Sequence, residues 1–516
     1  MKKNTKKIMM FAMATVLACS SFLSVGCGQQ KTPDSETDLQ ISLLQSGIPS
    51  GLLDGIIAEF NKQYPNINVI VDETLAFGYF DTTIPTDANT NSIDLYLMCS
   101  ANIMNIITMN EGFLADLSPV VDAKLDGHSK TIRERLNSRY AEIFTMEDGS
   151  IYTLPWQSQA HGMVYNKKWF DDNGFVMAST TDELIELCDA IAEKGEKAFI
   201  GSNTQYWCYL YEGWWAQYQG VEEYFNFYSA TDALGTQPSN KVWAQQGRLE
   251  ALEVLEDIFS FNSDNTYKYV VPGSNTMTHT EAQTKFLNGV GKMMANASWL
   301  EAEMAAHWKD GQDIRMSKLP VVSSIIEVLP DKSVQNDAQL REVIAYIDAV
   351  AEGEDATKPS YVSDVDLARL VEARNVVYTT QQMNVAIPSY SKAKDAAMNF
   401  LKVMYSDTGL KELANKLLTL PGVTFDNEVN KPDTSKWSTF ANSAIKLQET
   451  ANYVYNPLNY PLFYKNGLTA FNSVPEFSIG ATNPNDRKSA YEFWEYDQAI
   501  VKSYWKNYLS AAGLED

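Results

Sequence analysis

Apolar and polar residues alternate in a regular way soon after residue 37, and the pattern predicts strands and helices in turn. Every second residue over 38–44 is apolar, which is the period of a strand. Helical spacing follows over 52–60, and the runs 68–71 and 93–98 predict two further strands. The last run is apolar apart from Asp94, which we interpret as a structural carboxylate at the strand end. This order favours an α/β lobe with a largely parallel sheet.

Other helices are predicted later in the chain. Thr180 and Glu183 have the spacing of a capping box, apolar residues follow at helical spacing, and Gly195 suits the C-terminal end. The same periodicity predicts helices over 335–351, 364–374 and 396–404. The last eighty residues are rich in aromatic residues and asparagine, and their pattern predicts no definite structure.

Residues 1–26 have the pattern of a secretory signal. Lysines over 2–7 precede an apolar run over 8–23, which is short of the ~20 residues that span a membrane. The sequence Leu-Ser-Val-Gly-Cys that ends at Cys27 is similar to a bacterial lipobox, although Ser24 stands where an aliphatic residue is usual. We therefore predict lipid attachment at Cys27.

The polar stretch 27–37 has no apolar periodicity and predicts a flexible tether. A lipid on Cys27 would hold a soluble body at the outer face of the cell membrane through this tether. We therefore expect an exported protein whose only membrane contact is its lipid anchor.

Composition and charge narrow the classes of function. The chain has 516 residues, with 65 acidic against 41 basic, a net charge of −24. This length exceeds one ordinary core, so at least two lobes are expected. The negative charge repels phosphate backbones and argues against nucleic-acid binding. Cys99, Cys188 and Cys208 form no CxxC pair, which favours free thiols over a disulfide framework and leaves one bridge possible.

Motifs of catalysis and metal binding are missing. The sequence contains no GxSxG, HExxH or Walker A motif, and its four histidines lack ligand spacing. We therefore expect no enzyme activity, no cofactor and no metal site. Acidic pairs such as 171–172 and 222–223 leave a surface glycoside hydrolase open as an alternative.

Five segments carry the most specific pattern, each a helix or strand joined to a characteristic turn. They occupy 56–69, 112–122, 151–175, 282–304 and 385–414. Together they resemble the extracellular solute-binding proteins of family 1, the carbohydrate-type receptors of ABC importers that include maltose-binding protein. The resemblance covers about 38–423.

The resemblance implies a monomeric, two-lobed, periplasmic-binding-protein-like α/β fold whose chain crosses between the lobes more than once. Residues 38–155 would begin the first lobe and 160–380 the second. Residues 384–425 would return to the first lobe, and 430–516 would end in the second. The ligand would lie in a central cleft that closes about hinge strands, and an ABC permease would be the partner.

A carbohydrate receptor needs flat aromatic rings beside amide or carboxylate side chains, because sugars have apolar faces and polar rims. Trp299 follows the strand at which the family places a sugar-stacking tryptophan. Trp156, Gln157 and Gln159 lie in a crossing segment that the family uses for ligand contacts. Strand alternation places the two glutamines on one side and Trp156 on the other, so we do not expect all three to touch the ligand.

The densest aromatic stretch, 206–215, falls where the family has a second stacking segment. We expect Tyr206 and Trp207 to face the ligand, in preference to Trp214 and Trp215. Loops of the first lobe are expected to add Gln45, Tyr79, Ser100 and Asn102.

These observations favour a lipid-anchored receptor that captures an oligosaccharide or a similar neutral carbohydrate for an ABC importer. The same scaffold could instead bind a peptide, a polyamine or an ion, because function resides in the site rather than in the fold.

Overall fold

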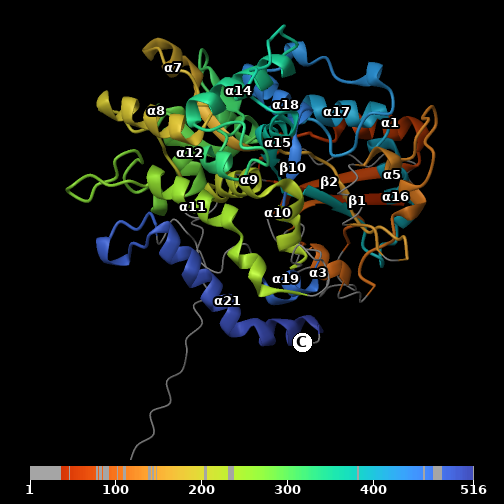
Figure 1. Cartoon of the computed structure of the whole chain (residues 1–516). Helices are drawn as coiled ribbons and strands as arrows, with labels where there is room; N and C mark the ends of the chain where they lie inside the picture. The colour runs from red at the N-terminus through yellow and green to blue at the C-terminus, as the bar shows by residue number, and fades with distance from the viewer. Residues whose placement is uncertain are drawn as a thin grey trace, which may run out of the picture.

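The computed structural model divides the chain into two α/β lobes, each with its own sheet and core (Figure 1). The first core draws on residues 39–156 and 383–425 and on Tyr455, and the second draws on 160–378 and on the rest of 440–512. The structure describes residues 37–514 except 46, 77–78, 81–83, 85–91, 101–102, 109–111, 137–140, 142–143, 147, 203–205, 231–237, 381–382, 457–459 and 469–478.

The first sheet has the strand order β2-β1-β3-β9-β4. Its strands are β1 (Thr37–Leu44), β2 (Ile67–Leu75), β3 (Leu95–Cys99), β4 (Leu154–Pro155) and β9 (Met383–Ala386). β1 is parallel to both β2 and β3, as the sequence pattern predicts. β9 is antiparallel to β3 and β4, because it belongs to a segment that re-enters the lobe from the opposite direction.

Helices complete the first lobe, and Figure 1 shows α1, α16 and α17 together on one side of the molecule. The helices of this lobe are α1 (Asp54–Gln63), α3 (Ile103–Thr108), α4 (Ser118–Val121), α5 (Ile132–Arg135), α16 (Lys394–Met404) and α17 (Asp407–Leu417). The predicted carboxylate Asp94 is confirmed as structural, since it accepts hydrogen bonds from the Gln40 N–H (2.9 Å) and the Ser391 hydroxyl (2.6 Å).

The second sheet has the order β10-β8-β5-β6, with β7 paired to β5. Its strands are β5 (His161–Asn166), β6 (Met293–Ala297), β7 (Ile314–Ser317), β8 (Val376–Tyr378) and β10 (Asn452–Val454). β5 is antiparallel to β6, β7 and β8, and only β10 and β8 are parallel. The two sheets therefore differ in strand direction.

The second lobe has most of the helices. They are α7 (Lys167–Asn173), α8 (Thr181–Glu193), α9 (Trp207–Gln219), α10 (Val221–Tyr228), α11 (Gln246–Ile258), α12 (His279–Leu287), α13 (Leu300–Glu303), α14 (Asp337–Ala351), α15 (Asp364–Arg374), α18 (Thr439–Glu449), α19 (Pro461–Asn466) and α21 (Ala490–Ala512). Thr180 caps α8 as predicted, but the Glu183 carboxylate binds the Ser179 N–H (2.6 Å) instead of closing a capping box.

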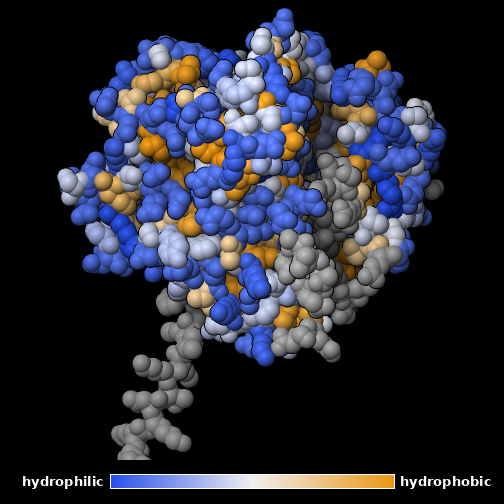
Figure 2. All heavy atoms as spheres, in the orientation of Figure 1, coloured by the Kyte–Doolittle hydropathy of each residue, from blue (hydrophilic) through white to orange (hydrophobic). Residues whose placement is uncertain are grey.

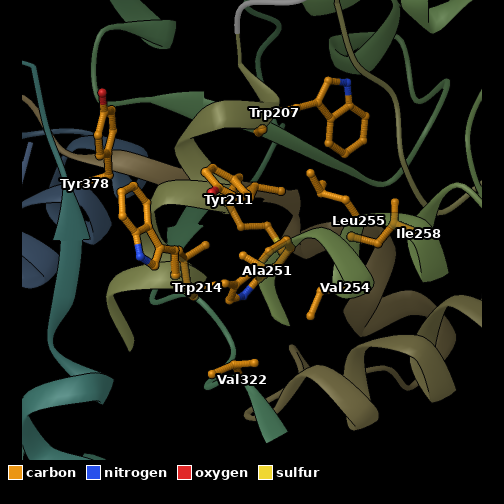
Figure 3. Close-up of a cluster of buried hydrophobic side chains, with 14 of the residues drawn as sticks. Trp207, Tyr211, Trp214, Ala251, Val254, Leu255, Ile258, Val322 and Tyr378 are labelled. Carbon is orange, nitrogen blue, oxygen red and sulfur yellow. The ribbon is translucent and has the colours of Figure 1, made fainter. Parts of the chain in front are cut away.

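Aromatic residues of α9 fill the core of the second lobe against α11 (Figure 3). Beside them, Arg248 and Asp497 form a fully buried ion pair with a 2.6 Å contact. This pair joins α11 to α21, the long helix at the lower edge of Figure 1. α21 begins with a capping box between Ser489 and Glu492, and its extent was not predicted from the sequence.

The chain passes between the two cores near 156–160, after Tyr378 and after Phe425. Ser158, in the first passage, donates its N–H to the Leu420 carbonyl (3.2 Å). Its carbonyl accepts from the hydroxyl of Thr419 (3.0 Å) and the side-chain amide of Gln448 in α18 (3.3 Å). These bonds hold the first passage against residues near the third.

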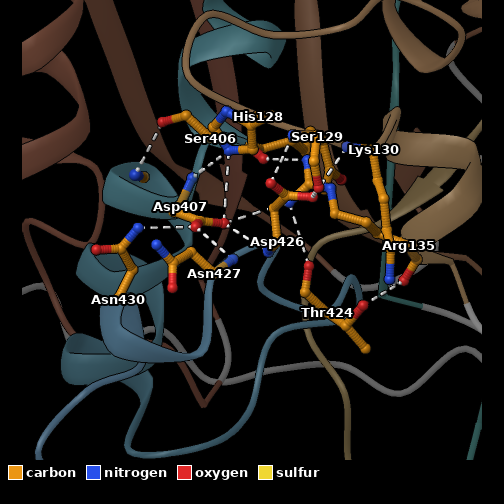
Figure 4. Close-up of polar contacts among 12 residues, drawn as sticks. His128, Ser129, Lys130, Arg135, Ser406, Asp407, Thr424, Asp426, Asn427 and Asn430 are labelled. Carbon is orange, nitrogen blue, oxygen red and sulfur yellow. Dashed lines mark hydrogen bonds and ion pairs between the residues drawn. The ribbon is translucent and has the colours of Figure 1, made fainter.

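Polar contacts fasten the returning segment to the rest of the first lobe (Figure 4). Asp407 accepts backbone N–H groups of Asp426 (2.9 Å) and Asn427 (3.0 Å) and lies 3.6 Å from Arg135. Asp426 in turn accepts the Ser129 N–H (2.7 Å). Hydrogen bonds to backbone and side chains outweigh burial and lower the pKa of Asp407, so the carboxylate is favoured here.

Hydrophilic residues predominate on the face shown in Figure 2, and hydrophobic residues form smaller patches. This surface agrees with the acidic composition. None of the described helices is long and apolar enough to cross a membrane.

Candidate functional site

Five aromatic residues gather where the first passage enters the second lobe, and we call them the junction cluster. They are His161, Tyr206, Tyr209, Trp299 and Tyr378. They come from β5, the start of α9, the turn between β6 and α13, and the end of β8. Elements that are distant in sequence therefore present their rings at one place.

Stacked tyrosines form one side of the junction cluster. The rings of Tyr206 and Tyr209 stack with centroids 5.3 Å apart, and Tyr209 stacks on Tyr378 at 5.7 Å. Burial raises the pKa of Tyr209 well above its usual 10, and nearby Cys208 and Cys99 contribute to the shift. Cys99 ends β3, so the cluster lies within electrostatic range of the first lobe.

Trp299 is half-buried, as is Tyr209. Trp299 is the N-cap of the short helix α13, two residues after the end of β6, and its ring centroid lies 4.8 Å from that of His161. Its ring lies beside that of Tyr206, with centroids 6.4 Å apart. Burial raises the pKa of Tyr206, and the negative charge of Glu303 adds to this effect. Trp299 is thus held in place and still partly exposed.

His161 is the innermost ring, with 1% of its surface exposed. It meets Tyr209, Trp299 and Tyr378 edge-on, with centroids 4.4 to 5.6 Å away. Burial lowers the pKa of His161 to about 3, so the imidazole is neutral near pH 7. Neither ring nitrogen has a hydrogen-bond partner of good geometry in the described part of the chain.

Amide side chains of the first passage lie between the lobes. The Gln159 amide donates to the Gln157 carbonyl oxygen (3.2 Å), and Gln159 also accepts from Thr380 of the second passage (3.4 Å). Trp156 points to the other side, as strand alternation predicts. Its ring is buried in the first core and donates to the Met98 carbonyl (3.2 Å).

A carboxylate marks the edge of the cluster. Glu303 accepts from the Gln283 amide (2.7 Å) and lies 3.8 Å from the imidazole of His279. A Cβ atom placed on Gly47, in the loop after β1, would lie 3.9 Å from the Glu303 Cβ. Glu303 therefore borders the first lobe.

The predicted first-lobe residues differ in their placement. Gln45 is exposed and belongs to the loop that carries Gly47. Ser100 is buried at the end of β3, and Tyr79 is 55% exposed. Asn102 lies outside the described residues.

Trp207 is not part of the junction cluster. Its ring is 1% exposed and packs against Phe199 and Phe259, with centroids 5.8 and 4.9 Å away. Figure 3 shows it in the core formed by α9 and α11, with Trp214. Of the two aromatic residues predicted in this stretch, only Tyr206 reaches the cluster.

The site residues predicted from the sequence did not include Tyr209, His161, Tyr378 or Glu303. A signal existed for Tyr209, because it follows Tyr206 by three residues and so shares its helix face. No local pattern joins Tyr378 to Trp299, since β8 and β6 are distant in sequence.

The described residues contain no group of three or more His, Cys, Asp or Glu side chains that could hold a metal ion.

A hollow of about 410 Å³ lies in the second lobe, away from the junction cluster, and is lined in part by Phe259, Phe261 and Arg487. The Arg487 guanidinium lies over the Phe261 ring at 3.0 Å from its centroid.

The profile of the bacterial extracellular solute-binding proteins matches residues 47–411, which is most of the chain. The protein therefore belongs to this family, as the motif order predicts. Membership in an extracellular family implies an exported protein, and the family and the similar structures are binding proteins.

The chain is also similar in sequence to a sugar-binding protein. The multiple sugar-binding protein of Streptococcus mutans is 23% identical over 194 residues, which cover 37% of this chain and 43% of that protein. This chain thus matches less than half of that relative's length.

Similar solved structures establish the two-lobed fold. RafE of Streptococcus pneumoniae, solved with raffinose, has 13% identity, and the match covers 90% of this chain and 99% of that chain, with a TM-score of 0.56. A substrate-binding protein of Listeria monocytogenes, solved with cycloalternan, has 15% identity, with 93% and 100% coverage and a TM-score of 0.57.

Proposed function

We propose that this protein captures an oligosaccharide or a similar neutral carbohydrate between its lobes and delivers it to the permease of an ABC importer. The observation that carries this proposal is the half-buried ring of Trp299, which lies beside Tyr206 and near Glu303, together with the amides of the first passage. Flat rings beside fixed donors and acceptors suit the apolar faces and hydroxyl rims of sugars.

Specific capture would depend on the fixed polar groups. A hydroxyl that loses water and finds no partner costs about 1–3 kcal/mol, so only a sugar whose hydroxyls meet the protein's groups binds well. Gln157 and Gln159 are 6% exposed and hold each other in place, which would lower the cost of ordering them on binding.

Closure of the lobes would distinguish the ligand-bound protein from the free protein. The passages at 156–160 and 379–380 would form the hinge, and a ligand that contacts both lobes favours the closed form. The permease would recognise that form.

The names of similar proteins agree with a carbohydrate ligand. They include a multiple sugar-binding protein and structures solved with raffinose or cycloalternan. The identities are low, so they support the class of ligand without selecting one sugar.

Attachment to the membrane would use a lipid on Cys27, with 27–37 as the tether. In cells fed radiolabelled palmitate, we expect label on the wild-type protein and none on Cys27→Ser. Equal labelling of both proteins would contradict the anchor.

The protein would bind its ligand without changing it. We expect chromatography to recover the glycan intact after prolonged incubation, and shorter products that vanish on an acid-to-amide substitution would instead identify a glycoside hydrolase.

Calorimetry against a panel of neutral oligosaccharides tests the proposal, with raffinose, cycloalternan, xylotriose and chitotriose included. Peptides, spermidine and ferric ion form the comparison set. We expect saturable binding within the sugar set. Binding only within the comparison set would overturn the proposal.

A further inference from the structure

The carboxylate of Glu303 lies at the edge of the junction cluster, on the same helical turn as Trp299. Glu303 ends the helix that Trp299 begins, and its N–H donates to the Trp299 carbonyl (2.9 Å). Residues four apart lie on the same helix face. Glu303 and Trp299 are therefore placed on the same face of one helical turn.

Among the described residues, the carboxylate of Glu303 makes one hydrogen bond and one longer polar contact. One oxygen accepts from Gln283 (2.7 Å), and the other lies 3.8 Å from His279, which is longer than a hydrogen bond. A carboxylate offers about four acceptor positions. Most of its capacity is thus not used by these two neighbours, and the side chain keeps 15% of its surface exposed.

The surroundings do not supply a permanent positive charge. None of the described ring or hydrogen-bond partners of Trp299, Tyr206 and Glu303 is a lysine or an arginine. His161 beside the indole is neutral near pH 7 because of its burial. A negative charge on a ligand would therefore meet the Glu303 carboxylate with no lysine or arginine among these partners, and with the exposed imidazole of His279 at 3.8 Å from the carboxylate as its basic neighbour.

We propose that Glu303 selects the charge class of the ligand: it accepts hydrogen bonds from sugar hydroxyls at Trp299 and excludes sugars with a carboxylate or phosphate there. This inference rests on the proposed carbohydrate function. The loop at Gly47 approaches the stem of Glu303 from the first lobe, so closure would also remove water that could screen two like charges.

Calorimetry with matched sugars tests the selection. The probes are the tightest-binding neutral oligosaccharide of the panel and its uronic-acid derivatives, with one primary hydroxyl oxidised in each. We expect at least one derivative to bind wild-type protein about 100-fold more weakly than the parent. In Glu303→Gln we expect the parent to weaken about tenfold and the gap to the excluded derivative to shrink to about tenfold.

Two variants serve as controls. Glu301→Gln makes the same charge change on the same turn, where the carboxylate instead binds the Ser438 hydroxyl, and should keep the wild-type discrimination. Glu303→Asp keeps the charge and should keep most of the exclusion. Melting curves of all variants confirm that they are folded.

The outcomes separate this inference from the proposed function. Wild-type protein that binds no sugar contradicts both. Wild-type protein that binds the neutral parent and every acidic derivative within threefold overturns only the role of Glu303. Full wild-type exclusion by the Glu303→Gln variant would also overturn that role alone.

Discussion

Two aromatic regions of the second lobe lie next to each other and differ in character. In the core between α9 and α11, Trp207, Trp214 and Trp215 are almost completely buried. In the junction cluster, Trp299 is half-buried, and its ring lies against those of His161 and Tyr206. Trp207 of the core and Tyr209 of the cluster belong to one helix, α9.

The difference shows that aromatic content alone does not identify a binding site. One face of α9 stabilises the lobe and another meets the other lobe, so neighbouring residues have separate roles. A substitution in the core should mainly change stability, and one in the cluster should mainly change affinity. The following changes test this division.

Trp207→Ala should have the largest effect. The ring packs so tightly that a Cβ atom on Gly201 would lie 2.5 Å from its Nε1. Removing a fully buried tryptophan leaves a cavity and should lower the free energy of unfolding by about 3–5 kcal/mol. Urea denaturation measures this loss. A small loss of stability with a large loss of sugar affinity would reverse the assignment of Trp207.

Glu212→Gln should change the pH dependence of stability. Glu212 is buried in α9 and accepts from the hydroxyls of Tyr224 (2.9 Å) and Tyr228 (3.2 Å). Burial raises its pKa from 4.5 to about 7, while these hydrogen bonds oppose the shift. Between the two values, the unfolded chain has released this proton and the native protein retains it.

Wild-type stability should therefore fall as the pH rises from about 4.5 to about 7, by up to about 3 kcal/mol from this group. Below this window the contribution is fully present, and above it the loss is complete. The variant cannot titrate at residue 212 and should lack this part of the decline. Unfolding free energies at pH 5 and pH 8 measure it, and parallel curves for the two proteins would contradict the expectation.

Trp299→Ala should weaken sugar binding by about 2 kcal/mol, or roughly 30-fold, because it removes the stacking surface. The ring is half-buried, so the unfolding free energy should change by about 1 kcal/mol or less. Calorimetry and thermal melting on the same preparations give both numbers. An unfolded variant would instead indicate that Trp299 belongs to the core.

Trp156→Phe should have the smallest effect. The variant loses the hydrogen bond to the Met98 carbonyl inside the first core, which should cost about 1 kcal/mol of stability. Sugar affinity should stay at the wild-type value, since the ring points away from Gln157 and Gln159. A marked loss of affinity would place Trp156 in the site.

Much of the fold was predictable because short-range periodicity determines it. The pattern over 38–44 and 364–374 gave β1 and α15 to within a residue. The strand directions in the second sheet were harder to predict from the sequence, because long segments separate β5, β6 and β8. α21 was missed because aromatic residues lie on both its buried and its exposed positions.

The site was predictable only in part, for a related reason. Trp299 and Tyr206 stand next to the ends of elements that the sequence identifies, and the structure places both in the junction cluster. The sequence could not show which face of α9 carries the junction cluster, so Trp207 was among the predicted residues and Tyr209 was not. His161, Tyr378 and Glu303 became visible only when the fold brought their elements together.

The most direct test of carbohydrate capture at the lobe junction is a crystal structure with the tightest-binding sugar of the panel. We expect a sugar ring on the face of Trp299, enclosed by both lobes, with hydroxyls near Glu303 and the amide pair of the first passage. A sugar bound only elsewhere, such as in the hollow beside Phe261 and Arg487, would contradict capture at the junction.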